Sequence, residues 1–138
     1  MIPTVFNKSQ IVYLAGPCSG EDIEEMASYY EQAQYFTKEL IKKGFVVISP
    51  ILNSWVDSPE DYLNNNIELE WQHYLCHDIN LISKISPDIC AVMPGWEKSK
   101  GACVEVAIFR NFLGITEIPV EELLEDSPCE DIINRPRP

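Results

Sequence analysis

The sequence contains few basic residues, and this scarcity restricts the ligands that the protein can bind. Its 138 residues include 10 Lys and Arg against 22 Asp and Glu, which gives a formal net charge of −12 at pH 7. Nucleic-acid backbones and anionic membranes are bound by clustered Lys and Arg, so we expect neither polymeric nucleic acid nor a membrane as a partner. A small nucleotide remains compatible, because a helix N-terminus and a few donors can hold a phosphate.

The sequence also lacks the features of a secreted or membrane-spanning protein. No apolar run approaches the roughly 20 residues that a spanning helix needs. Residues 1–10 do not have the basic-then-apolar pattern of a signal peptide. The cysteines are odd in number and show no C-x-x-C spacing. We therefore expect a cytoplasmic protein with reduced thiols at Cys18, Cys76, Cys90, Cys103 and Cys129.

Signals for metals and dinucleotide cofactors are equally sparse. His73 and His77 have the i, i+4 spacing that metal ligands can have on a helix, but no third ligand stands at a recognisable spacing. Two solvated helix residues are therefore the favoured interpretation. Neither the Walker pattern nor G-x-G-x-x-G occurs, which disfavours dinucleotide binding. We expect no metal and no organic cofactor.

Short apolar segments alternate with helical patterns along the chain. The expected strands are 11–15, 45–49, 89–93 and 115–118, and the expected helices are 22–43, 67–84 and 100–113, with a short acidic helix after Pro119. The polar stretch 53–66 is expected to be a long loop, and residues 127–138 a Pro-rich tail behind one domain at 1–126. This alternation indicates an α/β protein with a mainly parallel sheet covered on both faces.

In such a sheet the ligand crevice lies beyond the carboxyl ends of the strands, which here lead into loops at Gly16, Pro50 and Pro94. The loop at 94–101 (PGWEKSKG) enters the third helix. Its glycines permit close backbone approach, and Ser99, two lysines and the helix N-terminus offer donors and charge. This composition is typical of a site for a small anion or for sugar hydroxyls.

Two acidic residues interrupt the apolar faces of their helices. On a helical wheel of about 100° per residue, Glu105 lies at the centre of a face made by Gly101, Ala102, Ile108, Phe109 and Phe112. Asp78 lies in the same way among Trp71, Tyr74, Leu75, Leu81, Ile82 and Ile85. A buried carboxylate is costly unless it is paired or protonated. Both positions therefore require an explanation.

One such acid alone most often caps a loop or bonds a buried Tyr or Trp. Two acids flanking the same strand favour a function, because paired carboxylates in a partly apolar cleft suit glycosidic chemistry. Tyr13 belongs to the first strand and lies near its carboxyl end, beside the expected crevice. It is a third candidate, and a core tyrosine with a satisfied hydroxyl group is an equally good interpretation.

Several motifs, taken in their order and spacing, resemble a known group of enzymes. These are YLAGP at 13–17, Ser49–Pro50, Asp78, and PGWEKSKG at 94–101 followed by Glu105. Over about residues 11–115 the chain resembles the nucleoside 2-deoxyribosyltransferase-like superfamily, which includes the 2′-deoxynucleoside 5′-monophosphate N-hydrolases. The resemblance implies a flavodoxin-like three-layer sandwich and cleavage of an N-glycosidic bond. It also implies a homodimer or higher homo-oligomer.

The resemblance assigns a role to each of the three candidates. Glu105 would attack the anomeric carbon, Asp78 would bind the sugar or handle the proton of the base, and Tyr13 would hold the nucleophile by a hydrogen bond. The transferases carry an aspartate where Ser99 stands, whereas the monophosphate hydrolases carry a phosphate-binding serine there. The hydrolases also have an arginine where this chain has Ser19, so phosphate binding would rest on serines and lysines.

The expected function is hydrolysis of a 2′-deoxynucleoside 5′-monophosphate through a glutamate nucleophile. Base exchange by a deoxyribosyltransferase and nucleotide binding without cleavage are the alternatives. Asn53 and Trp55 could contact the base, although a surface cap and a packed indole are equally good interpretations. The residues expected to bind substrate are Gly16, Pro17, Ser19, Gly20, Asn53, Trp55, Gly95, Trp96, Lys98, Ser99 and Gly101.

Overall fold

The four short apolar segments form one parallel sheet in the computed structural model, which describes residues 10–18, 22–53 and 71–125. Its strands are β1 (Ile11–Ala15), β2 (Val46–Ile48), β3 (Ile89–Val92) and β4 (Ile118–Pro119), in the order β2-β1-β3-β4. Every neighbouring pair is parallel, and Tyr13 of β1 lies opposite Ile48 of β2 and Cys90 of β3. β1 is therefore central, and the carboxyl ends of all strands meet at one edge.

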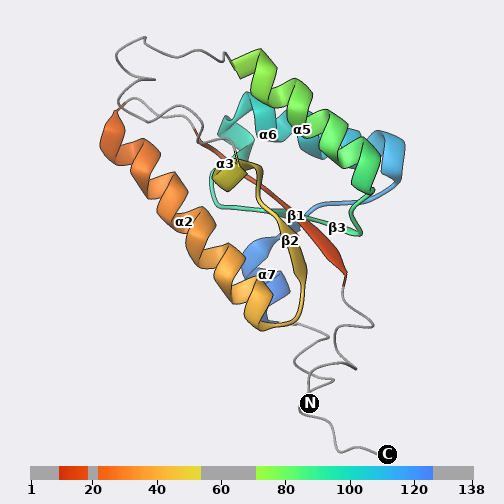
Figure 1. Cartoon of the computed structure of the whole chain (residues 1–138), viewed down its shortest axis with the longest axis horizontal. Helices are drawn as coiled ribbons and strands as arrows, with labels where there is room; N and C mark the ends of the chain where they lie inside the picture. Colours follow the sequence, from red (N-terminus) through yellow and green to blue (C-terminus); the bar gives the residue numbers. More distant parts are fainter. Residues whose placement is uncertain (1–9, 19–21, 54–70, 126–138) are drawn as a thin grey trace, which may run out of the picture.

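Helices cover both faces of this sheet, which makes the three-layer flavodoxin-like sandwich that was expected (Figure 1). The helices are α2 (Ile23–Lys42), α3 (Pro50–Asn53), α5 (Trp71–Ile85), α6 (Lys100–Ile108) and α7 (Val120–Glu125). In Figure 1, α2 and α7 lie on one side of the strands and α5 and α6 on the other. Among the described residues, no helix is both long and apolar enough to cross a bilayer.

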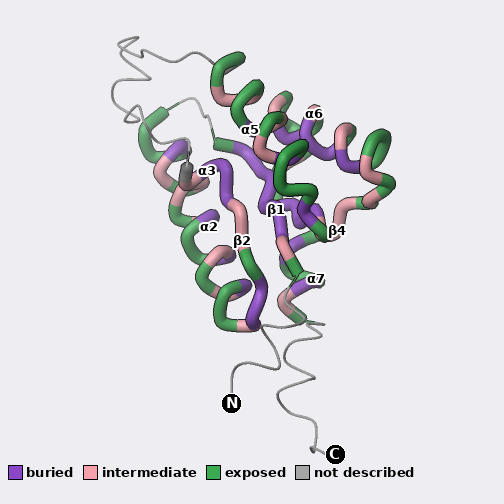
Figure 2. The backbone as a smooth tube through the Cα atoms, turned by 45° about the vertical axis from the view of Figure 1, so that its right-hand side comes forward, coloured by how far each residue is buried: buried purple, intermediate pink, exposed green. Residues whose placement is uncertain are grey.

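Alternating side chains of the strands divide the core into two clusters. Val12 and Leu14 face α2 and α7, whereas Tyr13 and Ala15 face α6, because successive strand residues point to opposite sides. Figure 2 shows the buried residues running along β1 between the two helical layers. Tyr13 thus enters the layer that also contains the helix of Glu105.

Helix α2 forms largely as the charge pattern predicts. Asp22 is the N-cap, and its carboxylate accepts a hydrogen bond from the Glu25 backbone N–H at 2.8 Å. Acidic residues occupy the first turn and Lys42 the last, which complements the helix dipole. Gly44 follows with a positive φ of 95° and ends the helix.

Most elements begin and end within one or two residues of the expected positions, but the region after β2 and the fourth strand differ. A short helix, α3, begins at Pro50, where the sequence suggested the start of a loop, since proline suits the first turn of a helix. The fourth strand is Ile118–Pro119 rather than 115–118. The Ile115 N–H still donates to the Phe109 carbonyl at 2.9 Å, so the chain leaves the helix late and reaches the sheet only at Ile118.

The third helix also ends differently from the expected regular helix over 100–113. After α6 the chain forms a π-helical turn, η2 (Phe109–Leu113), and Gly114 ends it with φ 67°. A π turn is wider than an α turn, so residues beyond it no longer follow the α-helical wheel. Phe109 is fully buried, but Phe112, which the wheel placed on the inward face, is 82% exposed.

Candidate active site

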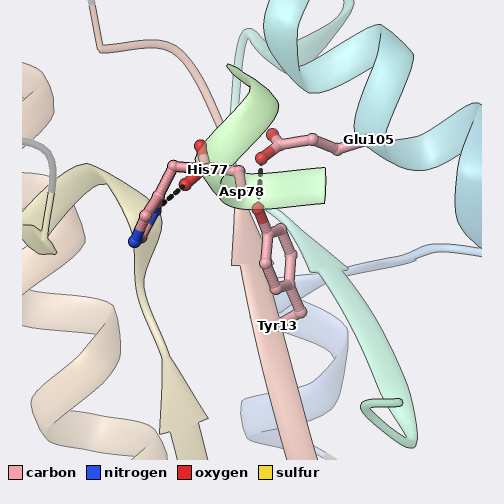
Figure 3. Close-up of polar contacts among 4 residues, drawn as sticks. All are labelled: Tyr13, His77, Asp78 and Glu105. Carbon is pink, nitrogen blue, oxygen red and sulfur yellow. Dashed lines mark hydrogen bonds and ion pairs between the residues drawn. The ribbon is translucent and has the colours of Figure 1, made fainter. Parts of the chain in front are cut away.

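Tyr13, Asp78 and Glu105, the three candidates, meet on the α5 and α6 side of the sheet (Figure 3). They come from β1, α5 and α6, three elements that lie far apart in sequence. Their exposed fractions are 0% for Tyr13, 8% for Asp78 and 5% for Glu105. The two acids therefore occupy the buried positions that their apolar neighbours on the helical wheel indicated.

A hydrogen bond joins the strand to the helix at the centre of this group. The Tyr13 hydroxyl donates to Oε2 of Glu105, between two buried side chains. The Tyr13 ring packs against Phe109, with ring centroids 5.3 Å apart and an interplanar angle of 50°. Since β1 is paired on both sides and Phe109 is fully buried, the phenol is held firmly in place.

Burial dominates the electrostatics of Glu105. Removal from water raises the pKa of its carboxyl group, the Tyr13 hydrogen bond lowers it, and interaction with Asp78 raises it, to about 8. The ordinary value for a glutamate is 4.5. Glu105 therefore holds a proton at neutral pH.

Asp78 is affected by the same burial but has a compensating neighbour. Desolvation raises the pKa of its carboxyl group, whereas hydrogen bonding with His77 and the interaction with Glu105 lower it. Burial, with the two acids nearby, raises the pKa of Tyr13 as well, so its hydroxyl remains a donor. Both carboxyl groups therefore have raised pKa values, and their environments differ because only Asp78 has a histidine beside it.

The loops that follow β1 and β3, called the rim below, lie at the carboxyl edge of the sheet. Gly16 is required by close packing, because a Cβ there would lie 2.8 Å from the Met93 Cβ. Gly95 has a φ of 84°, and a Cβ built on it would be 3.9 Å from Cγ of Pro17. The two loops are thus neighbours at the carboxyl edge, as expected for a parallel sheet.

The remaining expected binding residues have varied positions. Ser99 is the N-cap of α6, where its hydroxyl oxygen accepts from the Ala102 N–H at 3.2 Å. Lys98 is exposed, Gly101 is half-buried, and Trp96 is half-buried against the core cluster beside Tyr13. Asn53 ends α3. Ser19, Gly20 and Trp55 lie outside the described residues.

His77 belongs to this site, although its sequence suggested only a solvated helix residue. Its Nδ1 lies 3.4 Å from Oδ1 of Asp78, and its side chain is 65% exposed. One sequence signal could have indicated this contact. His77 precedes the inward-facing Asp78, so it is turned by about 100° around the helix axis and lies at the margin of the buried face. No group of three or more potential metal ligands occurs within the described part of the chain.

Comparison with known proteins identifies the family of the chain. The model of a family described as a domain of unknown function (DUF4406) matches residues 10–116. The chain belongs to this family. No curated protein gives a significant match. The match to DUF4406 extends from the start of β1 beyond η2 and therefore includes Tyr13, Asp78 and Glu105.

Proposed function

We propose that the protein cleaves the N-glycosidic bond of a 2′-deoxynucleoside 5′-monophosphate, with Glu105 as the nucleophile. The observation that carries this proposal is the buried group of Tyr13, Asp78 and Glu105, in which two carboxyl groups have raised pKa values and one accepts a hydrogen bond from a phenol. The motif resemblance to nucleoside 2-deoxyribosyltransferase-like enzymes supports the same assignment, since the matching residues carry these roles there.

In the first step one proton is transferred twice, from Glu105 to Asp78 and then from Asp78 to the leaving base. When substrate binds, the proton of Glu105 passes to Asp78, and the Glu105 carboxylate forms a bond to C1′. The bond from C1′ to the base nitrogen breaks, and its electron pair returns to the base, which takes the proton from Asp78. The products of this step are a deoxyribosyl ester on Glu105, the free base and an ionised Asp78.

The second step regenerates the reactive form of the pair, from which return of the proton from Asp78 to Glu105 restores the starting state. The Asp78 carboxylate accepts a proton from a water molecule as that water attacks C1′, and the bond between C1′ and Glu105 breaks. Asp78 is then protonated, Glu105 is ionised, and 2-deoxyribose 5-phosphate leaves. The Tyr13 hydroxyl positions the Glu105 side chain in both steps, and it stabilises the negative charge of Glu105 whenever the ester is absent.

The preference for a monophosphate rests on the start of α6. Ser99 uses its oxygen to cap the helix, which leaves its hydroxyl hydrogen able to donate, and Lys98 and Lys100 are exposed nearby. Helix N-termini and lysines both favour anions. On a chain with a net charge of −12, such a local group of donors is a suitable place for a phosphate.

The mechanism requires that kcat/KM follow a bell-shaped dependence on pH. Above the pKa of Glu105, about 8, both acids are ionised and no proton remains for the leaving base. Below the pKa of Asp78 both are protonated and no nucleophile is available. Replacing Tyr13 with Phe removes the bond that lowers the Glu105 pKa, so the basic limb should move to higher pH.

The deciding experiment is incubation with deoxynucleosides and their 5′-monophosphates, with and without a different free base, followed by chromatography. We expect free base from monophosphates and no turnover in Glu105→Gln. Glu31→Gln is the matched control, since Glu31 is exposed on α2, across the sheet. Full activity of Glu105→Gln would contradict the proposal. Exchange of bases would identify a transferase, and recovery of an intact, bound nucleotide would identify a binding protein.

A further inference from the structure

His77 is the exposed end of a row of polar side chains that leads inward to Tyr13. Its imidazole contacts Asp78, the Asp78 carboxyl group interacts with Glu105, and Glu105 accepts the phenol hydrogen bond. Figure 3 shows His77 on one side of Asp78, with Glu105 and the Tyr13 hydroxyl on the other. The side chain of His77 is 65% exposed and that of Asp78 is 11% exposed, so solvent access falls sharply along the row.

We propose that His77 is a positioning residue, which holds the carboxyl group of Asp78 for proton transfer to and from the substrate. The proposal rests on the proposed function for the reaction that Asp78 serves, but the contact on which it depends belongs to the free protein. It adds a residue that neither the apolar stripe on α5 nor the motif resemblance includes.

The geometry supports this role through the two oxygens of Asp78. With its proton on Nδ1, the imidazole donates to Oδ1 across 3.4 Å. Oδ2 is then the oxygen available for Glu105 and for the substrate. An aspartate has few rotatable bonds, so fixing one oxygen fixes the direction of the other. Loss of the imidazole would leave a buried carboxyl group free to rotate away from the reacting atoms.

The electrostatics of the surrounding elements point in the same direction. The groups that interact with Asp78 are His77 on its own helix, Glu105 from α6 and Tyr13 from β1. Hydrogen bonding and charge at His77 both lower the pKa of Asp78, against the effect of burial. His77 therefore favours the ionised form of Asp78, the form that can receive the proton of Glu105, against the effect of burial.

The test compares three variants of α5. His77→Ala removes the contact, His77→Asn retains an N–H donor near the position of Nδ1, and His73→Ala removes an exposed imidazole one turn earlier. We expect kcat of His77→Ala to fall about tenfold with KM within about twofold, and the acidic limb of kcat/KM to move up by about half a pH unit. Asparagine should restore most of kcat, and His73→Ala should behave like the wild type.

A second measurement does not depend on turnover. Titration of the carboxyl carbons of ¹³C-labelled aspartate by NMR, with Asp78 assigned by its loss in Asp78→Asn, reports the ionisation of this side chain directly. We expect a higher midpoint for Asp78 in His77→Ala and a smaller change in His77→Asn. An unchanged midpoint, or an unchanged kcat and pH profile in His77→Ala, would overturn the positioning role.

These readouts separate the two proposals. If the wild-type protein cleaves no substrate while Asp78 titrates differently in His77→Ala, the proposed function fails and the coupling of His77 to Asp78 stands. If the wild-type protein is active but His77→Ala matches it in kcat, pH profile and Asp78 midpoint, the glycosidase assignment stands and His77 is only a surface residue.

Discussion

Replacing Glu105 with Gln should stabilise the protein at alkaline pH while removing the proposed activity. The side chain is 5% exposed, and its pKa is about 8 instead of the usual 4.5. At about 1.4 kcal/mol for each pKa unit, burying the ionised Glu105 carboxylate lowers the unfolding free energy by at most roughly 5 kcal/mol at high pH. The amide of Gln cannot ionise, can accept from Tyr13 and has nearly the same volume, so it avoids this cost.

The sign of the effect follows from proton binding. The folded protein retains a proton on Glu105 up to about pH 8, whereas the unfolded chain releases it above about pH 4.5. The free energy of unfolding therefore decreases as the pH rises through this interval and levels off above it. Asp78 contributes in the same direction, because its pKa is also raised. Relaxation around the buried pair reduces the expected difference between wild type and Glu105→Gln to about 2–3 kcal/mol at pH 8.

Urea unfolding and thermal unfolding, both monitored by circular dichroism at pH 5, 6, 7 and 8, would measure this difference. We expect the two proteins to have similar stability at pH 5 and to diverge with increasing pH, by on the order of 8 °C in Tm at pH 8. Glu31→Gln, an exposed substitution on α2, should keep the wild-type pH dependence. Parallel curves for wild type and Glu105→Gln, or a less stable variant at pH 8, would refute the argument that burial holds a proton on this residue.

Three further predictions concern the frame around the site. Phe109→Ala should cost about 3–5 kcal/mol in unfolding free energy, because Phe109 is fully buried. Phe112→Ala should cost less than about 0.5 kcal/mol, because that ring is 82% exposed. Equal losses of unfolding free energy in urea would contradict the different burial of the two rings. Gly16→Ala should destabilise by about 1–3 kcal/mol, since its Cβ would lie 2.8 Å from the Met93 Cβ, and an unchanged Tm would contradict this packing. Ser99→Ala should lose the N-cap of α6 and about 1 kcal/mol, with Ser99→Thr as the conservative comparison in the same melts.

The burial of the acidic pair could be predicted because an acid inside an apolar stripe is visible in the sequence. Glu105 and Asp78 each lie among apolar neighbours at helical spacing, and their helices pack on the same sheet face. The parallel sheet itself followed from apolar segments alternating with helices. The contact of the two acids with Tyr13 could not be predicted, since strand alternation does not tell which face of the sheet a residue lies on. In the structure Tyr13 faces α6.

Features that depend on departures from regular geometry could not be predicted in this way. The helical wheel assumed a constant turn, so it placed Phe112 inward, and only the wider turn of η2 brings this ring to the surface. The late start of β4 depends on a backbone hydrogen bond from Ile115 that no side-chain pattern encodes. The place of His77 in the site could not be predicted for a different reason. His77 is exposed and polar, so its sequence pattern is that of any solvated helix residue.

Tyr13, Asp78 and Glu105 all belong to regular elements of the fold, whereas the rim is made of loops. Regular elements are held by the shared core and tolerate little change, but loops at the end of a parallel sheet accept substitutions, insertions and deletions. Under the proposed function, selection could therefore alter which base or phosphate binds at the rim without rebuilding the acid pair. For protein engineering, the segment after β1 and the segment between β3 and α6 are consequently the places to diversify in a library, with the three buried residues and the structural positions Gly16, Gly95 and Ser99 kept constant.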